Sequence, residues 1–117
     1  MRFLCLVSFE PQTLAALSPT EKAALNRNSL AYNDELSRNN HYIAAEALEP
    51  VSSARTVRVR HGKTSVIDGP FAEAKEHVGG FILVEAANMN QALEVAAGIP
   101  LAKLGSIEVR PIQKIIA

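Results

Sequence analysis

Two short segments are apolar at every position, and they limit the folds open to this chain more than any other feature. They are residues 3–7, Phe-Leu-Cys-Leu-Val, and residues 81–84, Phe-Ile-Leu-Val. Both lie in short runs with β-branched and aromatic residues, which is typical of strands. A strand with one face in water would alternate polar and apolar residues. The sequence therefore predicts that both faces of these two strands are covered.

A long helix is predicted between the two strands, from Pro19 to Asn40. Ser18 can cap this helix, Pro19 suits its first turn, and Glu21 stands at the position that completes a capping box. Asn39 and Asn40 end it, because Asn tolerates the left-handed conformation. Apolar and small residues recur at near-helical spacing to give an inner stripe of Leu25, Ser29, Tyr32 and Leu36.

A second helix is predicted after Asn88, which can cap it with Gln91 at the third position. Gly98 is expected to end it. Its inner face is predicted to consist of Met89, Leu93 and Ala96.

Three further stretches read as strands or hairpins: residues 41–50, 55–69 and 106–112. The order is then strand-helix-strand, a hairpin insertion, and strand-helix-strand. Two such halves predict an α+β fold of the ferredoxin-like split βαβ type, with an antiparallel sheet and one domain over residues 1–117. Helices would cover only one face of that sheet. A second copy is the simplest cover for the other face, so we expect a homodimer through sheet faces, a dimeric α/β barrel.

Charge and composition exclude several classes of protein. Twelve basic and twelve acidic side chains cancel, which removes the usual electrostatic reason for binding nucleic acid. The basic run in residues 55–63 alternates with Thr and Val and reads as a solvated strand edge. No segment approaches the roughly 20 apolar residues that span a bilayer, and the first residues lack a signal peptide. We therefore expect a cytoplasmic protein without membrane contact. The single cysteine, Cys5, reads as a small buried hydrophobe rather than a reactive thiol.

Several motifs together resemble one family along nearly the whole chain. The most specific is DGPFAEAKEHVGGF at residues 68–81, followed by Asn88, by Ile99-Pro100 and by GSIEVRP at residues 105–111. Three further segments upstream carry the resemblance: LSPTEKAAL at residues 17–25, AAEALEP at residues 44–50 and TVRVRHGK at residues 56–63. These residues resemble the DGPF branch of the YCII-related family. The resemblance implies a small, bacterial, ferredoxin-like protein that forms a dimeric α/β barrel. Members of this branch are often encoded beside alternative sigma factors, and most have no assigned activity.

Other branches of that superfamily carry a proposed acid–base pair, a His on the first helix and an Asp near its end, and one branch catalyses dehalogenation. Alignment on residues 44–46 puts Ser29 and Arg38 at those two places, and residues 19–40 contain no His. Neutral imidazole can act as a base near pH 7, whereas a serine without an adjacent base cannot. The proposed pair is therefore not carried over to this chain.

Three ionisable residues are the candidates for catalysis: Asp68, Glu46 and His77. Asp68-Gly69-Pro70 is turn chemistry, since Asp bonds nearby backbone and Pro prevents the strand from continuing; Asp68 could instead be a general base at a strand end. Glu46 interrupts an apolar series and could point into a cleft between the sheet and the first helix. There it would be either half of an ion pair or an acid with a raised pKa. Its potential partners are Arg58, Lys75 and Arg110.

Candidate ligand-binding residues cluster in the same loop. They are Glu73, Lys75, Gly79, Gly80 and Arg58. A charge run of this kind is typical of a solvated face, and a Gly pair before a strand is typical of a bulge or a close backbone approach. The alternative is that the glycines make room for a ligand. Phosphate-loop and dinucleotide motifs are absent, and the three His residues have no metal-ligand spacing, so we expect no cofactor and no metal.

Two hypotheses of function follow. The first is a non-catalytic, dimeric ligand-binding or regulatory module. The alternative is a small acid–base enzyme that acts on a small polar or aromatic substrate. Its cleft would lie between the first helix and the loop of residues 68–80, with Asp68, Glu46 and His77 as the ionisable groups.

Overall fold

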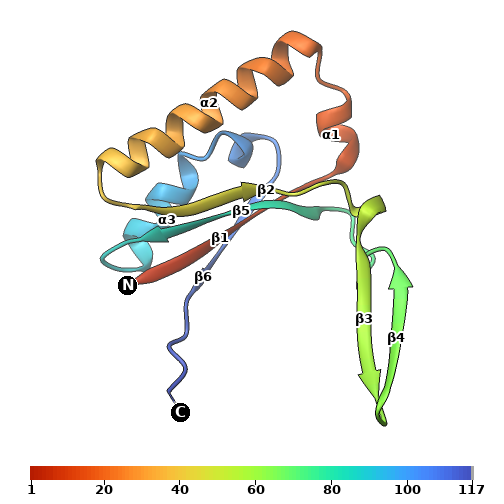
Figure 1. The fold of residues 1–117 in the computed structure, drawn as a ribbon. Helices are drawn as coiled ribbons and strands as arrows, with labels where there is room; N and C mark the ends of the chain where they lie inside the picture. The colour runs from red at the N-terminus through yellow and green to blue at the C-terminus, as the bar shows by residue number, and fades with distance from the viewer. Residues whose placement is uncertain (117) are drawn as a thin grey trace.

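A computed structural model describes residues 1–116 and shows a four-stranded antiparallel sheet, helices on one side of it, and a separate two-stranded hairpin (Figure 1). The elements are β1 (Arg2–Phe9), α1 (Pro11–Ala15), α2 (Pro19–Arg38), β2 (Tyr42–Ala47), η1 (Val51–Ser53), β3 (Arg55–Arg60), β4 (Lys63–Asp68), β5 (His77–Glu85), α3 (Met89–Ala97), η2 (Pro100–Lys103) and β6 (Ser106–Pro111). This mixture of helices and antiparallel strands confirms the α+β class. No helix described in residues 1–116 has the length and apolar character needed to cross a membrane.

The sheet has the strand order β2-β5-β1-β6, and each neighbouring pair is antiparallel. The two strands that are apolar at nearly every position, β1 and β5, are therefore the central ones. The helix α2 joins β1 to β2, and α3 joins β5 to β6. Each helix thus crosses over a strand that belongs to the other half of the chain. The β3–β4 hairpin is inserted between the two halves.

The predicted start of α2 is confirmed by its hydrogen bonds. The Glu21 amide donates to Ser18 Oγ at 3.1 Å, and the Ser18 amide donates to Glu21 Oε1 at 2.9 Å. The hydrogen bond from the Ser18 backbone, and then the one with its side chain, lower the pKa of the Glu21 carboxyl. The inner stripe is also as predicted, because Leu36 is buried and Tyr32 packs partly buried against the core.

The predicted inner face of α3 is partly wrong. Asn88 caps the helix as expected, with its Oδ1 accepting from the Gln91 amide at 2.9 Å. Leu93 is nevertheless exposed, while Ala92 and Val95 are buried. Ala92 and Leu93 follow Met89 by three and four residues, and both spacings lie near the same face of a helix. Which of the two is buried depends on how α3 packs on the sheet, so the sequence spacing alone could not decide it.

The hydrophobic core lies between the sheet and the helices. The β1 residues on this face are buried, and so are the β5 residues that pair with them. The buried core residues are Phe3, Cys5, Val7, Leu36, Ile82, Val84, Ala86, Ala92, Val95, Ala96 and Ile99. Strand alternation therefore puts the odd-numbered residues of β1 inside the chain's own core.

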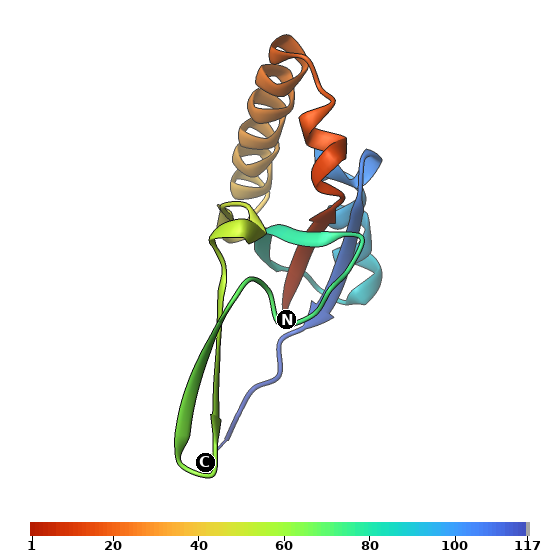
Figure 2. The same ribbon diagram turned by 90° about the vertical axis from the view of Figure 1, so that its right-hand side faces the viewer.

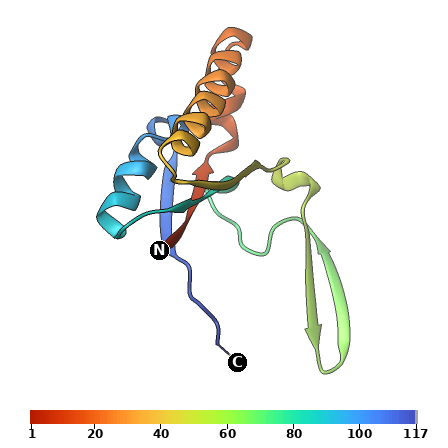
Figure 3. The same ribbon diagram turned by 60° about the vertical axis from the view of Figure 1, so that its left-hand side comes forward.

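The other face of the central strands is also apolar but is not covered by a helix. Leu4 pairs with Leu83, and Leu6 pairs with Phe81, so all four side chains share one face. All four are partly exposed. Both α2 and α3 lie on the opposite side of the sheet (Figures 1 and 3). We call the surface of Leu4, Leu6, Phe81 and Leu83 the open face.

The β3–β4 hairpin, residues 55–68, projects away from the rest of the chain, and we call it the arm. In all three views it extends on the side of the sheet opposite to the helices (Figures 1, 2 and 3). The radius of gyration is 16.2 Å, whereas a compact chain of this length has about 13 Å. The arm accounts for this extended shape.

The buried thiol of Cys5 makes stability depend on pH in alkaline solution. Burial raises the pKa of Cys5 from 9.0 to about 11. Between these values the unfolded chain loses the thiol proton while the folded chain keeps it. The unfolded state then binds fewer protons, so the free energy of unfolding falls as the pH rises, by up to about 1.4 kcal/mol per pH unit.

We expect this loss between pH 9 and 11 in urea denaturation of the native sequence. Cys5→Ala lowers the baseline stability but removes the contribution of the thiol to the slope. Equal slopes for the two proteins over this range would contradict the predicted effect.

Candidate functional site

The Asp-Gly-Pro-Phe segment closes the base of the arm through contacts with β3. Asp68 Oδ1 lies 3.1 Å from Arg55 Nε. The amide of Gly69 donates to the Ala54 carbonyl oxygen at 2.8 Å, and Thr56 Oγ1 donates to the Gly69 carbonyl oxygen at 2.8 Å. Gly69 has a φ of 94°, which other residues rarely adopt. The positive φ accounts for the Gly as a turn residue, while the Asp68 side chain contacts Arg55 across the hairpin.

The aromatic residue of the same segment has a contact of its own. The guanidinium carbon of Arg58 lies 4.6 Å from the centroid of the Phe71 ring, a cation–π arrangement. Arg58, predicted as a ligand-binding residue, is thus engaged with the loop that follows the arm. The segment therefore holds residues 54–58 and 68–71 together at the arm's base.

The three candidate catalytic residues lie on different parts of the structure. Asp68 is exposed at the end of β4. Glu46 is exposed and pairs with Phe81 on β5, on the open-face side of the sheet. The prediction that Glu46 points between the sheet and the first helix is therefore wrong. Its neighbour Ala45 packs against the core instead, and strand alternation sends Glu46 to the other face.

His77 also differs from the prediction, because it belongs to β5 rather than to the loop. It pairs with Phe9 of β1. Within residues 1–116 no hydrogen bond or ion pair joins any two of Asp68, Glu46 and His77. The acid–base cleft expected between the first helix and residues 68–80 has no support in these contacts.

The expected partners of Glu46 are engaged elsewhere. Lys75 Nζ lies 3.5 Å from Glu10 Oε1, and Arg110 Nε lies 3.9 Å from Glu108 Oε2. Both are exposed pairs, which contribute little to stability. Glu73 is exposed, as expected for a solvated face.

The Gly79-Gly80 pair fits close packing rather than an opening for a ligand. The register between β1 and β5 shifts here, which indicates a bulge at Gly79. A Cβ on Gly79 would overlap the ring of Phe9, and one on Gly80 would lie 2.9 Å from the carbonyl oxygen of Glu46. Neighbouring groups already occupy the space that a side chain would need.

Two shallow grooves lie along α2, on the helix side of the molecule. The larger has a volume of about 340 Å³ and is lined by Asn28, Ala31, Tyr32, Glu35, Arg38, Gly98 and Pro100. The smaller has about 200 Å³ and is lined by Tyr32, Glu35, Leu36, Asn39, His41, Gln91, Glu94 and Val95. These surfaces could not be predicted from the sequence, because their residues come together only when α2 and α3 pack.

Tyr32 lines both grooves, and its hydroxyl has a structural role. Tyr32 Oη donates to the Val95 carbonyl oxygen at 2.6 Å and so ties α2 to α3. Burial raises the pKa of the Tyr32 phenol, with smaller contributions from the charges of Glu35 and Cys5. The phenol therefore keeps its proton at neutral pH and serves as a hydrogen-bond donor.

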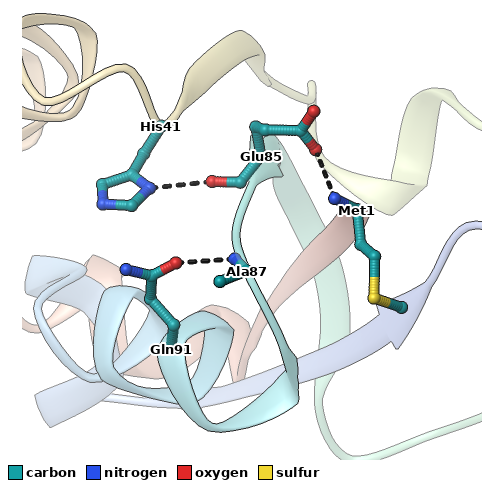
Figure 4. Close-up of polar contacts among 5 residues, drawn as sticks. All are labelled: Met1, His41, Glu85, Ala87 and Gln91. Atoms are coloured by element: carbon teal, nitrogen blue, oxygen red, sulfur yellow. Dashed lines mark hydrogen bonds and ion pairs between the residues drawn. The ribbon is translucent and has the colours of Figure 1, made fainter.

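The polar groups near the smaller groove hold the chain's own backbone (Figure 4). His41 Nδ1 lies 2.8 Å from the Glu85 carbonyl oxygen, and since a carbonyl only accepts, this nitrogen carries the proton. Gln91 Oε1 accepts from the Ala87 amide at 2.6 Å. The ammonium of Met1 lies 3.0 Å from Glu85 Oε2. In residues 1–116 no cluster of three or more His, Cys, Asp or Glu could hold a metal ion.

Comparison with known proteins identifies the family. The uncharacterized protein R00369 of Rhizobium meliloti (strain 1021) is 45% identical over 67 residues, which are 56% of this chain and 54% of that protein. This chain thus spans about half the length of that curated relative. A model of the YCII-related domain matches residues 1–116. Since that match extends over almost all of its residues, the chain belongs to the YCII-related family.

Proposed function

We propose that this chain is a non-catalytic module of the DGPF branch, which acts as a homodimer and binds a small ligand or regulates a partner. In this proposal each subunit has the ferredoxin-like fold, and two sheets pack by their open faces into a dimeric α/β barrel. The observation that carries the proposal is the open face itself. Four large apolar side chains lie on it, across the two central strands, away from both helices.

The surroundings of the open face suit a contact between copies. Leu6 lies between Phe81 on β5 and Glu108 on β6, and Glu46 pairs with Phe81 from the other edge strand. Across the sheet, this row of paired residues therefore begins and ends with a carboxylate, and its two central residues are large and apolar. An apolar centre with a polar rim is the usual anatomy of a protein interface. A two-fold axis would place the same patch on both copies.

The dispersed positions of the candidate acid–base residues support a non-catalytic role. Asp68 contacts Arg55 at the base of the arm, while Glu46 and His77 lie on separate strands. A general base must lie within hydrogen-bond reach of its proton, and a nucleophile must lie near its base. The contacts of these residues do not form such a set.

Dimerisation is tested by sedimentation equilibrium of the native sequence and of Leu83→Glu. We expect a dimer at micromolar concentration, and we expect Leu83→Glu to weaken it at least about 100-fold, because a charge would be buried in an apolar interface. Leu30→Glu is the matched control, since Leu30 on α2 is 66% exposed and lies away from the open face. Circular dichroism should show that both variants fold.

A monomeric native protein at micromolar concentration would contradict the proposed assembly, as would equal effects of the two substitutions. The same proteins then serve in a thermal-shift screen of small metabolites. A ligand that binds between the two sheets raises the melting temperature of the native dimer and of Leu30→Glu but not that of Leu83→Glu. Turnover of any screened compound would contradict the non-catalytic role.

A further inference from the structure

We propose that the arm of each subunit docks on the body of a second copy of this chain and so acts as a clasp across the dimer. This inference rests on the homodimer proposed above. It assigns a role to residues 55–68, which the core of the fold does not use.

One face of the arm is apolar and bare. Val57 pairs with Val66, and Val59 lies two residues further along β3, so the three side chains share a face. They are 60%, 61% and 57% exposed, in the order Val57, Val66 and Val59. Three neighbouring valines in water on one hairpin face are a mark of an interaction surface.

The opposite face of the arm contacts the loop that follows it, although Ile67, which pairs with Thr56 on that face, is 53% exposed. This face includes Thr56, which donates to the Gly69 carbonyl oxygen, and Arg58, which lies over the Phe71 ring. Thr56 and Arg58 are less exposed than the valines. The loop after the arm thus anchors one face at its base and leaves the valine face free.

A two-stranded hairpin of this kind has little stability of its own. Isolated hairpins are marginally stable in water and need a third strand or a packing surface. The arm forms its own two-stranded sheet and does not join the four-stranded one. The contacts at residues 54–58 and 68–71 secure only its base. A surface from another molecule would supply the missing packing for the valines.

The direction of the arm points to a second copy as that molecule. The arm and the open face lie on the same side of the sheet, opposite α2 and α3 (Figures 1, 2 and 3). A copy seated on the open face would therefore lie beside the arm. The two-fold axis of such a dimer would give the second arm the same contact with the first subunit.

Charge distribution supports the same partner. The arm has four basic residues and one acidic residue, a net charge of +3. The whole chain has twelve of each, so the rest of the chain has eight basic and eleven acidic residues, a net charge of −3. The basic residues of the arm are Arg55, Arg58, Arg60 and Lys63. A basic arm and an acidic body on the same chain attract each other across two copies.

Photo-crosslinking between isotopically distinct copies tests the contact directly. Val59→Cys is labelled with a benzophenone maleimide, which is selective because Cys5 is buried. The benzophenone-labelled protein is mixed with native protein that carries no benzophenone and was grown on ¹⁵N. The mixture is irradiated, and the cross-linked peptides are identified by mass. We expect covalent dimers that join the arm peptide of one isotopic form to a body peptide of the other. Leu30→Cys, labelled in the same way, is the control and should give few.

A pair of substitutions gives an independent readout. Val59→Glu should raise the dissociation constant of the dimer about tenfold or more, as expected for a residue central to an interface. Ser65→Glu introduces the same side chain on the other face of the arm, since Ser65 pairs with Arg58, and should change the constant less than about twofold.

The outcomes separate this inference from the proposed dimer. If the native protein is a dimer that Leu83→Glu disrupts, but Val59 gives no cross-link between copies and Val59→Glu has no effect, the clasp is wrong and the dimer stands. Cross-links from the arm to its own chain alone would also overturn the clasp. A native protein that is monomeric at all concentrations would overturn both.

Discussion

Phe3→Ala should destabilise the folded chain by about 3–5 kcal/mol, which is the cost typical of truncating a buried Phe. Phe3 is 0% exposed and lies on the central strand β1, paired with Val84 and next to Pro111. Truncation removes its apolar contacts and leaves a cavity that two central strands cannot collapse to fill. Since a domain of this size has about 5–15 kcal/mol of stability in all, the loss should be a large fraction of the total.

Urea denaturation at one fixed protein concentration measures this effect, because dimerisation would make stability depend on concentration. Phe71→Ala is the matched control. Phe71 is 71% exposed and contacts Arg58, so its truncation should cost about 1 kcal/mol or less. A similar loss in both variants would show that the core does not lie where the structure places it.

The second large effect is expected for Gly105→Ala, which should cost about 2–3 kcal/mol by overpacking. A Cβ at this position would overlap the carbonyl oxygen of Ser8 and lie 3.0 Å from Phe9 Cβ and 3.1 Å from Phe9 Cα. These atoms belong to the central strand β1, mostly to its backbone. They cannot move aside without disturbing the pairing of β1 with both of its neighbours.

Thermal or urea unfolding of Gly105→Ala checks this prediction against Ser106→Ala. Ser106 is the adjacent, exposed residue at the start of β6, and its truncation should change stability by less than about 0.5 kcal/mol. A free energy of unfolding for Gly105→Ala within about 0.5 kcal/mol of the native value would show that β6 can shift away from β1.

Elements set by short-range signals could be predicted from the sequence. The box of Ser18 and Glu21 and the cap at Asn88 each depend on groups three residues apart, and both formed as predicted. The strands of the sheet were also placed nearly correctly. The short helix α1 and the turn η1 were missed, and β5 begins at His77, earlier than its apolar run suggested. Pairing with Phe9 extends that strand, and such a pairing is not visible in a local pattern.

The candidate site could be predicted only in part. The turn at Gly69 follows from the local sequence, since its φ of 94° suits glycine, whereas the ion pair of Asp68 with Arg55 depends on the pairing of β3 with β4. Glu46 was assigned to the wrong face of the sheet, because alternation along a strand defines two faces without saying which one meets the helices. The grooves beside Tyr32 were not found at all, since their walls come from α2, α3 and η2.

By itself, the sequence determined the caps, the turn at residues 68–70 and the apolar character of both faces of β1 and β5, because each depends on residues close together in the chain. Only the tertiary structure decided that the odd-numbered residues of β1 face the helices and that the arm extends on the side of the open face. Those features depend on strand register and helix packing, which join residues far apart in sequence. Their free energy comes from burying whole surfaces rather than from any local motif.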